Sequence, residues 1–220
     1  MEIIGAYTAD RASALSGVPK STIHYWARSD VLVPSVSPER VKLWSYSDLL
    51  GLRFIYWLRR PKVAEGGWGI PRTSMPAVRR ALRMLNALDL DLFEEGRPTV
   101  LIDGTGRLMV EPPGESPHTL EGQLVAKGLI DLIAPFTADE GLRGPDLARP
   151  SEFVRIVPRK LAGAPHIRET RVETQALHTL ELRGFSPERI ARLYPALDPA
   201  AIQDALAVER QLAENLRPAA

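Results

Sequence analysis

The fold is decided by residues 8–28, TADRASALSGVPKSTIHYWAR. Thr8 is a favourable N-cap for a helix, and Gly17 permits the left-handed backbone that a sharp turn requires. Pro19 suits the first position of a following helix, where its missing N–H costs nothing. Apolar side chains recur at helical spacing on both sides of the turn, at Ala12, Leu15, Ile23 and Trp26. The stretch therefore predicts a helix, a tight turn and a second helix.

The second of these helices leaves one face free for solvent, and every residue on that face can donate a hydrogen bond. The six residues are Lys20, Ser21, Thr22, His24, Tyr25 and Arg28. Donors and cations on an exposed helix suit the phosphates and base edges of a DNA major groove. The alternative is a small helical hairpin whose polar face is only solvated.

The next residues favour a DNA-binding unit. Residues 31–44 hold two short β-prone runs around a turn, which predicts a β-wing that places Arg40 and Lys42 beside the DNA backbone. An exposed loop with solvated charges is the alternative. Ser45 followed by Asp48 is similar to a capping box, so we expect a third helix from Tyr46 to about residue 60.

Tyr7–Leu58 resembles the winged helix-turn-helix of the MerR family, which implies duplex DNA binding. The resemblance differs at His24, where the family usually has Arg, and at Asp30, where it usually has Gly. These two departures bear on DNA affinity and sequence preference rather than on the fold. The matching residues are Ala12, Leu15, Gly17, Val18, Ser21, Thr22, Ile23, Tyr25, Trp26, Leu32, Pro34, Trp44, Ser45, Asp48 and Leu49.

The chain divides into four predicted parts: a head at 1–60, a middle region at 61–134, a linker at 135–150 and a C-terminal domain at 151–220. In the middle region the apolar spacing predicts a helix at 74–88, and Gly104 and Gly106 predict a β-hairpin at 98–111. Residues 125–133 are an apolar run that fits either a strand or a short helix. Glycine, proline and charged residues favour a linker at 135–150.

The C-terminal domain has three predicted helices. The first runs from Thr174 to Leu182 and ends before Gly184, which suits a C′ position. Ser186 and Asp198 each precede a proline, which is the signature of an N-cap followed by the first helical residue. The predicted fold class is therefore mainly α with small β elements: a winged helix-turn-helix followed by a three-helix, helix-turn-helix-like domain.

This domain resembles the DUF433 family. The motifs that carry the resemblance are Gly163-x-Pro165-x-Ile167, Thr170-Arg171-Val172, Gly184-Phe185-Ser186-Pro187-Glu188-x-Ile190 and Leu193-Tyr194-Pro195. Proteins of this family look like antitoxins of PIN-type ribonuclease toxins. A MerR-like head with a DUF433 tail is similar to the VapB-type arrangement, which implies a DNA-binding antitoxin of a type II toxin–antitoxin system. Its expected partners are operator DNA, where it represses its own operon, and a cognate PIN-type toxin.

Arginines of the C-terminal domain are candidate toxin contacts. A ribonuclease site built from carboxylates around a divalent cation is anionic, so an inserted arginine can pair with its ligands. Arg168 and Arg171 are the first choice, because their loop carries the family-like turn. Other arginines of this domain fit simple solvation of helix faces. If the linker separates the modules, truncation after Pro150 removes toxin neutralisation and leaves DNA binding intact.

Composition excludes several classes. The chain has no cysteine, which excludes disulfides and thiolate metal sites, and 28 Lys and Arg balance 27 Asp and Glu, so any DNA surface must be local. Its N-terminus lacks the pattern of a secretory signal, and we expect a cytoplasmic protein. The four histidines, His24, His118, His166 and His178, have no metal-ligand spacing. We therefore predict no enzyme, no metal and no cofactor.

Two further expectations concern assembly and an alternative function. One recognition helix covers only a few base pairs, which favours a homodimer that presents two of them. The alternative to an antitoxin is a stand-alone MerR-like regulator that binds a small effector in its middle region. Trp57, Trp68 and the hairpin around Gly104 are the candidate pocket residues, although core packing also accounts for them.

Overall fold

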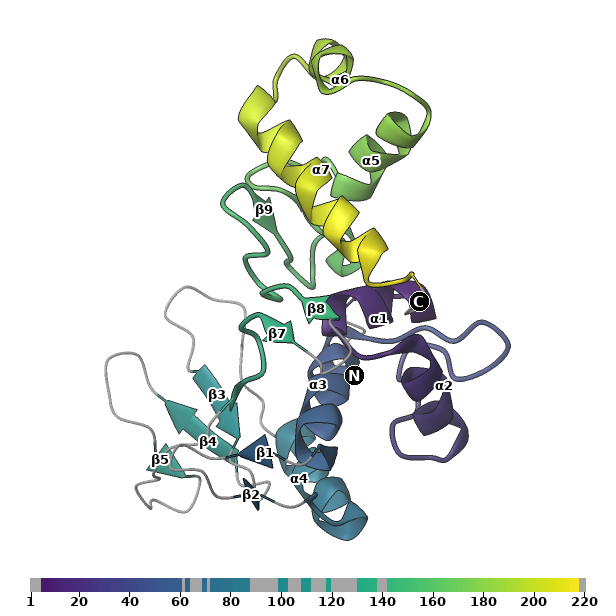
Figure 1. Cartoon of the computed structure of the whole chain (residues 1–220), viewed down its shortest axis with the longest axis vertical. Coiled ribbons are helices and arrows are strands. Elements are labelled where there is room, and N and C mark those ends of the chain that lie inside the picture. The colour runs from purple at the N-terminus through teal and green to yellow at the C-terminus, as the bar shows by residue number, and fades with distance from the viewer. Residues whose placement is uncertain are drawn as a thin grey trace.

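The computed structural model describes residues 5–60, 62–63, 69–70, 72–87, 99–102, 108–111, 118–119, 130–137 and 142–217. Within this part the chain is mainly helical with short strands, which confirms the predicted fold class. The N-terminal helices and the C-terminal helices form two groups that meet at α1 (Figure 1). The helices are α1 (Ala9–Ser16), α2 (Lys20–Arg28), α3 (Tyr46–Arg59), α4 (Met75–Ala87), α5 (Thr174–Leu182), α6 (Pro187–Leu193) and α7 (Pro199–Glu214).

The strands are short and antiparallel. The predicted hairpin is confirmed as β3 (Thr99–Ile102) paired with β4 (Leu108–Glu111), while its turn lies outside the described residues. The sheet order is β5-β4-β3-β6, with β5 at His118–Thr119 and β6 at Ile130–Asp131. The remaining pairs are β1 (Lys62–Val63) with β2 (Gly69–Ile70), β7 (Phe136–Thr137) with β8 (Arg143–Gly144), and β9 (Val154–Arg155) with β10 (His166–Ile167).

The turn between α1 and α2 forms as predicted. The Thr8 side chain accepts a hydrogen bond from the backbone N–H of Arg11, and Gly17 adopts a φ of 71°. A Cβ at Gly17 would lie 2.7 Å from the backbone nitrogen of Gly144, so both conformation and packing require glycine there. Val18 is fully buried beneath the turn. The helix-turn-helix therefore rests directly on the segment that contains β8.

A capping box fixes the start of α3, as predicted. The Ser45 side chain accepts from the backbone N–H of Asp48, and the Asp48 carboxylate accepts from the backbone N–H of Ser45 at 2.7 Å. The same carboxylate also accepts the backbone N–H and the hydroxyl of Ser35. Asp48 thus ties the chain that leaves α2 to the first turn of α3.

Arg53, in the middle of α3, is fully buried. Its guanidinium donates to the carbonyls of Leu15 and Ser16 at the C-terminal end of α1, where the helix dipole is negative. Backbone carbonyls from the segment that follows the sheet complete its surroundings: those of Leu132, Ile133, Ala134 and Pro145. Arg53 therefore joins α1, α3 and residues 132–145 into one unit.

The C-terminal helices pack against α1. Arg11 on α1 and Glu209 on α7 form two hydrogen bonds, of 2.6 and 2.7 Å, and the Glu209 side chain is only 4% exposed. The Glu209 carboxylate also accepts the hydroxyl of Thr174 on α5. Near the end of α7, the Asn215 amide donates to the carbonyl of Ala14 at 3.0 Å. We call this contact between α1 and the helices α5 and α7 the seam.

Residues 135–150, for which a linker is predicted, take part in this packing where they are described. Phe136 and Gly144 pair across β7 and β8, and Leu147 is fully buried. The Leu147 carbonyl accepts the hydroxyl of Tyr46 from α3 at 2.8 Å. At these described positions the segment is therefore packed and does not form the predicted linker.

The three C-terminal helices begin as predicted. The Ser186 side chain accepts from Arg189, the Asp198 side chain accepts from Ala200, and a proline opens each of these two helices. Gly184, with a φ of 86°, follows the end of α5. The three helices contribute to the hydrophobic core through Leu177, Ile190, Ile202, Ala205 and Leu206, which are buried.

Candidate nucleic-acid interface

The structure leaves four of the six predicted donors of α2 exposed and the other two half-buried. Ile23, Trp26 and Ala27 are buried and hold the helix in place. Among the donors, Thr22 and His24 are half-buried, and the others are exposed: Lys20, Ser21, Tyr25 and Arg28. Tyr25 is 60% exposed, so its ring and hydroxyl are accessible to a ligand. This surface is called the α2 face below.

The cations of the α2 face are accessible to phosphate. The Lys20 ammonium lies 2.5 Å from the Asp10 carboxylate, and both side chains are about half exposed. An ion pair at such a surface is worth little, so a phosphate can replace the carboxylate. Arg28 forms no ion pair within the described residues, which leaves its guanidinium available to a ligand.

Burial and the surrounding charges lower the pKa of His24. Burial lowers its pKa below the ordinary value of 6.5, and the cations Lys20, Arg28 and Lys42 lower it further against the opposing effect of Asp10. His24 is therefore neutral at neutral pH and carries one ring donor and one ring acceptor, which suits a base edge better than a phosphate. The influence of Lys42 shows that the wing and α2 contribute to the same electropositive surface.

The predicted wing is a short hairpin. Ser37 and Leu43 form an antiparallel bridge with backbone hydrogen bonds of 2.9 and 3.1 Å. Arg40 is exposed near the tip, and the Lys42 ammonium donates to the carbonyl of Pro38 at 2.7 Å. A second bridge joins Trp44 to Tyr7, so the wing is anchored to the strand-like entry into α1.

The predicted toxin contacts lie elsewhere. Arg168 and Arg171 are exposed in the turn between β10 and α5, on the C-terminal group of helices. Thr170 fixes this turn, because its hydroxyl donates to the carbonyl of Ile167 and accepts the backbone N–H of Val172. The structure therefore brings Arg168 and Arg171 near each other in one turn but does not bring them to the α2 face (Figure 1).

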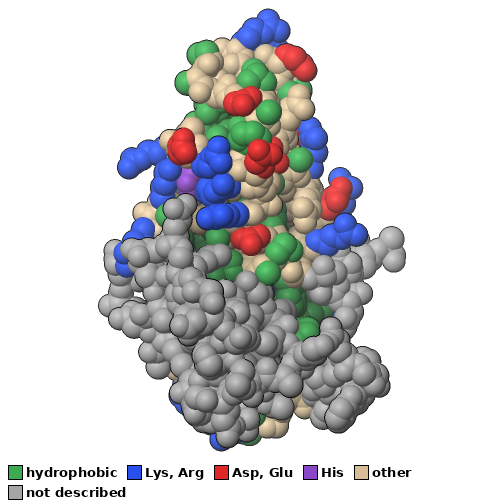
Figure 2. Space-filling model, turned by 90° about the vertical axis from the view of Figure 1, so that its left-hand side faces the viewer, with side chains coloured by type: hydrophobic (Ala, Val, Ile, Leu, Met, Phe, Trp, Pro, Cys, Tyr) green, Lys and Arg blue, Asp and Glu red, His purple; other side chains and the backbone are tan. Residues whose placement is uncertain are grey.

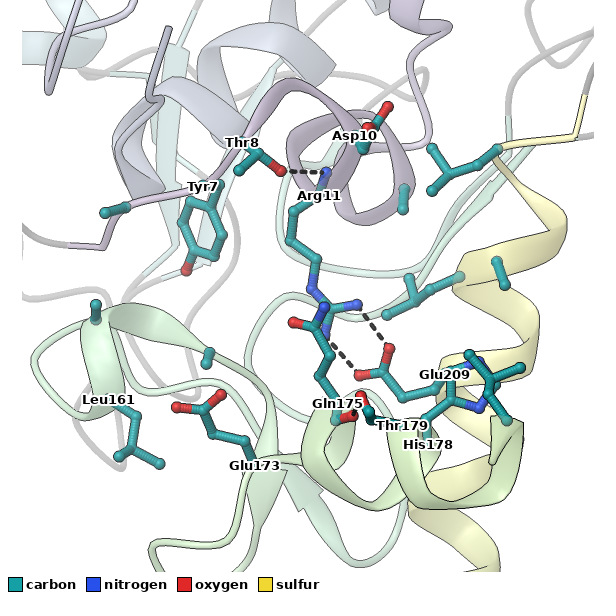
Figure 3. A pocket seen from close by; sticks show the side chains of 18 residues that line it. Tyr7, Thr8, Asp10, Arg11, Leu161, Glu173, Gln175, His178, Thr179 and Glu209 are labelled. Carbon is teal, nitrogen blue, oxygen red and sulfur yellow. Dashed lines mark hydrogen bonds and ion pairs between the residues drawn. The ribbon is translucent and has the colours of Figure 1, made fainter. Parts of the chain in front are cut away.

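The seam contains a pocket of about 460 Å³ that sequence reasoning missed. It opens between α1, α5 and α7, with the Arg11–Glu209 pair at its centre and Glu173 and His178 on its wall (Figure 3). Arg11 and Glu209 are 198 positions apart, and no local signal in the sequence indicates that they meet. Of the pocket residues predicted in the middle region, Trp57 is half-buried on α3, whereas Trp68 and Gly104 lie outside the described residues.

Metal-ligand clusters and membrane-spanning helices are both absent from the residues that the structure describes. No group of three or more His, Asp or Glu side chains converges there as metal ligands. No described helix combines the length and apolar character needed to cross a membrane. His178, one of the four histidines, instead contacts the Glu181 carboxylate at 3.0 Å.

Comparison with known proteins identifies two segments. Residues 7–62 match the family model of the MerR HTH family regulatory proteins, and residues 154–207 match that of the DUF433 proteins of unknown function. These matches confirm the two resemblances found in the sequence, and each covers well under half of the chain. No curated protein and no solved structure matches.

Proposed function

We propose that this chain is a DNA-binding transcriptional regulator whose α2 face enters the major groove. The observation that carries the proposal is the exposure of Lys20, Ser21, Tyr25 and Arg28 on a helix of a segment that matches the MerR helix-turn-helix family. Lys20 and Arg28 contact phosphates, while Thr22, His24 and Tyr25 face the base edges. Arg40 and Lys42 of the wing contact the adjacent backbone.

Removal of the cations on the α2 face should weaken DNA binding. We expect Lys20→Ala and Arg28→Ala each to reduce affinity for the DNA upstream of the gene several-fold and to lower the slope of log K against log salt by about one. Gel-shift or anisotropy titrations at several salt concentrations measure both. Arg183→Ala is the matched control, because Arg183 is equally exposed but lies at the end of α5. Equal affinity for the wild type and both α2 variants would contradict the assignment.

We further propose that the protein acts as the antitoxin of a type II toxin–antitoxin system. It represses its own operon through the α2 face and neutralises a PIN-type ribonuclease through the C-terminal domain. The match of residues 154–207 to DUF433 beside a MerR-type head supports this, as does the exposure of Arg168 and Arg171. A homodimer with two recognition helices about 34 Å apart on one face of the operator fits the same function.

A ribonuclease assay tests this finer proposal. The toxin candidate is the small protein encoded by the adjacent reading frame, and Arg168→Ala/Arg171→Ala should relieve its inhibition by the full chain. Point substitutions are preferable to truncation after Pro150, because loss of α7 would expose the buried side of α1. An adjacent protein that keeps full activity in the presence of excess wild-type chain would rule out the antitoxin role and leave DNA binding untouched.

The second candidate function is a regulator that responds to a small effector. The seam pocket favours it, because a volume of about 460 Å³ suits a small molecule and because the pocket contacts α1 of the helix-turn-helix directly. A rise in melting temperature with a small metabolite, in the absence of any protein partner, would distinguish this function from that of an antitoxin.

A further inference from the structure

A second basic surface lies on the C-terminal domain, around β9 and β10. Figure 2 shows Lys and Arg side chains gathered on this side of the molecule. Four cations on this surface act electrostatically on one another or on His166. Arg149 and Arg168 act on Arg155, while Lys160 and Arg155 act on His166. We call these four residues the β9–β10 patch.

Backbone and aromatic contacts hold two of these arginines in place. Arg155 on β9 donates to the carbonyls of Ser151, Glu152 and Val154 at 2.8–3.0 Å, and it lies opposite His166 of β10. The backbone N–H of Arg168 donates to the carbonyl of Phe153 at 2.7 Å, and its guanidinium lies 5.9 Å from the centre of the Phe153 ring. These contacts with backbone carbonyls and an aromatic ring do not neutralise the charge of either guanidinium.

Asp146 and Asp204, the two carboxylates that act electrostatically on Arg155, already have other partners. Asp146 accepts the backbone N–H groups of Ala148 and Arg149, each at 2.7 Å. Asp204 accepts the hydroxyl of Ser151 and the backbone N–H of Phe153. These two carboxylates therefore cap the loop that supports the patch.

Neighbouring cations act on Arg155. Burial lowers the pKa of Arg155, and the neighbouring Arg168 and Arg149 lower it further despite Asp146 and Asp204. An anion bound at the patch would relieve this repulsion. The Arg168 side chain is about half exposed, and its distance to the Glu169 carboxylate, 3.9 Å, is too long for a strong pair.

The position of the patch decides which anion fits. In Figure 1, β9 lies in the C-terminal part of the molecule and α2 in the N-terminal part, so the patch and the α2 face are separate surfaces. The exposed carboxylates of Glu152 and Glu169 border the patch and would repel a continuous phosphate backbone. A folded protein, in contrast, presents its carboxylates at discrete points, so these can be placed away from Glu152 and Glu169.

We propose that the β9–β10 patch is the docking surface for an acidic surface of a partner protein, which can bind while the α2 face holds DNA. This deepens the proposed antitoxin function, on which the identity of the partner rests. It adds Arg149, Arg155 and Lys160 to Arg168 as partner contacts, and it makes the partner surface independent of the DNA surface.

Two fluorescent probes test the proposal on the full chain: a 15-residue alanine-based peptide that carries a glutamate at every fourth position, and a duplex of arbitrary sequence. The test variant is Arg149→Glu/Arg168→Glu, and the control is Arg183→Glu/Arg192→Glu, which makes the same change in charge at exposed positions around α6. We expect the test variant to bind the peptide roughly tenfold more weakly than the control does, at equal affinity of both for the duplex. All four positions are exposed, and unchanged melting temperatures verify that both variants fold.

Equal loss of peptide binding in both variants would overturn the proposal, because it would reflect net charge alone. A selective loss of duplex binding in the test variant would also overturn it and assign the patch to nucleic acid. The proposed DNA-binding function fails separately, if the wild type does not bind duplex or if Lys20→Ala and Arg28→Ala leave duplex binding unchanged.

Discussion

Arg53→Met should destabilise the N-terminal helices more than any substitution on their surface. The change removes the donors that serve the carbonyls of Leu15, Ser16 and Pro145, and it leaves buried acceptors without partners. Each such acceptor costs on the order of 1–3 kcal/mol when it stays dry. Allowing for water that enters the vacated space, we expect a loss of about 3–5 kcal/mol, against a total stability of about 5–15 kcal/mol for a typical protein.

Urea denaturation followed by circular dichroism measures this loss. Arg59→Met is the matched control, because Arg59 lies at the end of the same helix, is only half-buried and donates to the carbonyl of Thr73. We expect the control to lose about 1 kcal/mol and Arg53→Lys to fall between the two methionine variants. A smaller loss for Arg53→Met than for Arg59→Met would show that Arg53 does not organise this part of the fold.

Glu209→Ala should weaken the seam by a similar amount. Removal of one partner from a buried charge pair leaves the other charge poorly solvated, at a cost of about 3–5 kcal/mol. Arg11, whose side chain is 18% exposed, is that remaining charge, and Thr174 loses an acceptor as well. The double variant Arg11→Ala/Glu209→Ala no longer has an unpaired buried charge. Its loss of unfolding free energy should therefore be smaller than the sum of the losses in the two single variants.

A double-mutant cycle in urea measures the coupling between Arg11 and Glu209. The control pair is Lys20 and Asp10, which forms a surface contact with both side chains about half exposed. Its coupling should stay below about 1 kcal/mol. Additive effects of Arg11→Ala and Glu209→Ala would contradict a seam that joins the two groups of helices.

The Arg11–Glu209 pair also predicts how the stability of the fold depends on pH. Burial alone would raise the pKa of Glu209, but the hydrogen bonds and charge of Arg11 and the hydroxyl of Thr174 outweigh burial, and the pKa lies below its ordinary 4.5. A carboxyl group with a depressed pKa in the folded state stabilises that state above its unfolded pKa. The contribution of Glu209 is thus fully present at neutral pH and is lost as the pH falls from about 4.5 through the lower folded value. Glu209→Gln should flatten this part of the acid-unfolding curve.

Sequence reasoning succeeded where the deciding interactions are local. The Thr8 cap, the turn at Gly17 and the capping box of Ser45 and Asp48 each involve residues within a few positions of one another. Helical periodicity also separated the six donors of α2 from its buried residues, such as Ile23 and Trp26. These features follow from spacing and from the hydrogen-bonding capacity of single residues, which one sequence displays.

Long-range contacts could not be predicted in this way. In the sequence, Arg53 is recognisable only as a charged residue within an apolar helix, because the carbonyls that it binds lie up to 92 positions away. The Arg11–Glu209 pair joins the first helix to the last, and the linker predicted from Gly and Pro content includes the buried Leu147. The Gly and Pro content of a segment indicates its local flexibility. Its burial depends on which distant part of the chain packs against it, and composition does not show this.

Amide hydrogen exchange with and without duplex shows whether DNA binds at the α2 face. Saturation with the upstream duplex should protect residues 20–28 and the wing at 37–43, while α5, α6 and α7 exchange at their unchanged rates. Lys20→Ala/Arg28→Ala should remove this protection at the same concentrations. Protection of residues 174–214 without protection of residues 20–28 would contradict the account and would assign DNA binding to the C-terminal domain.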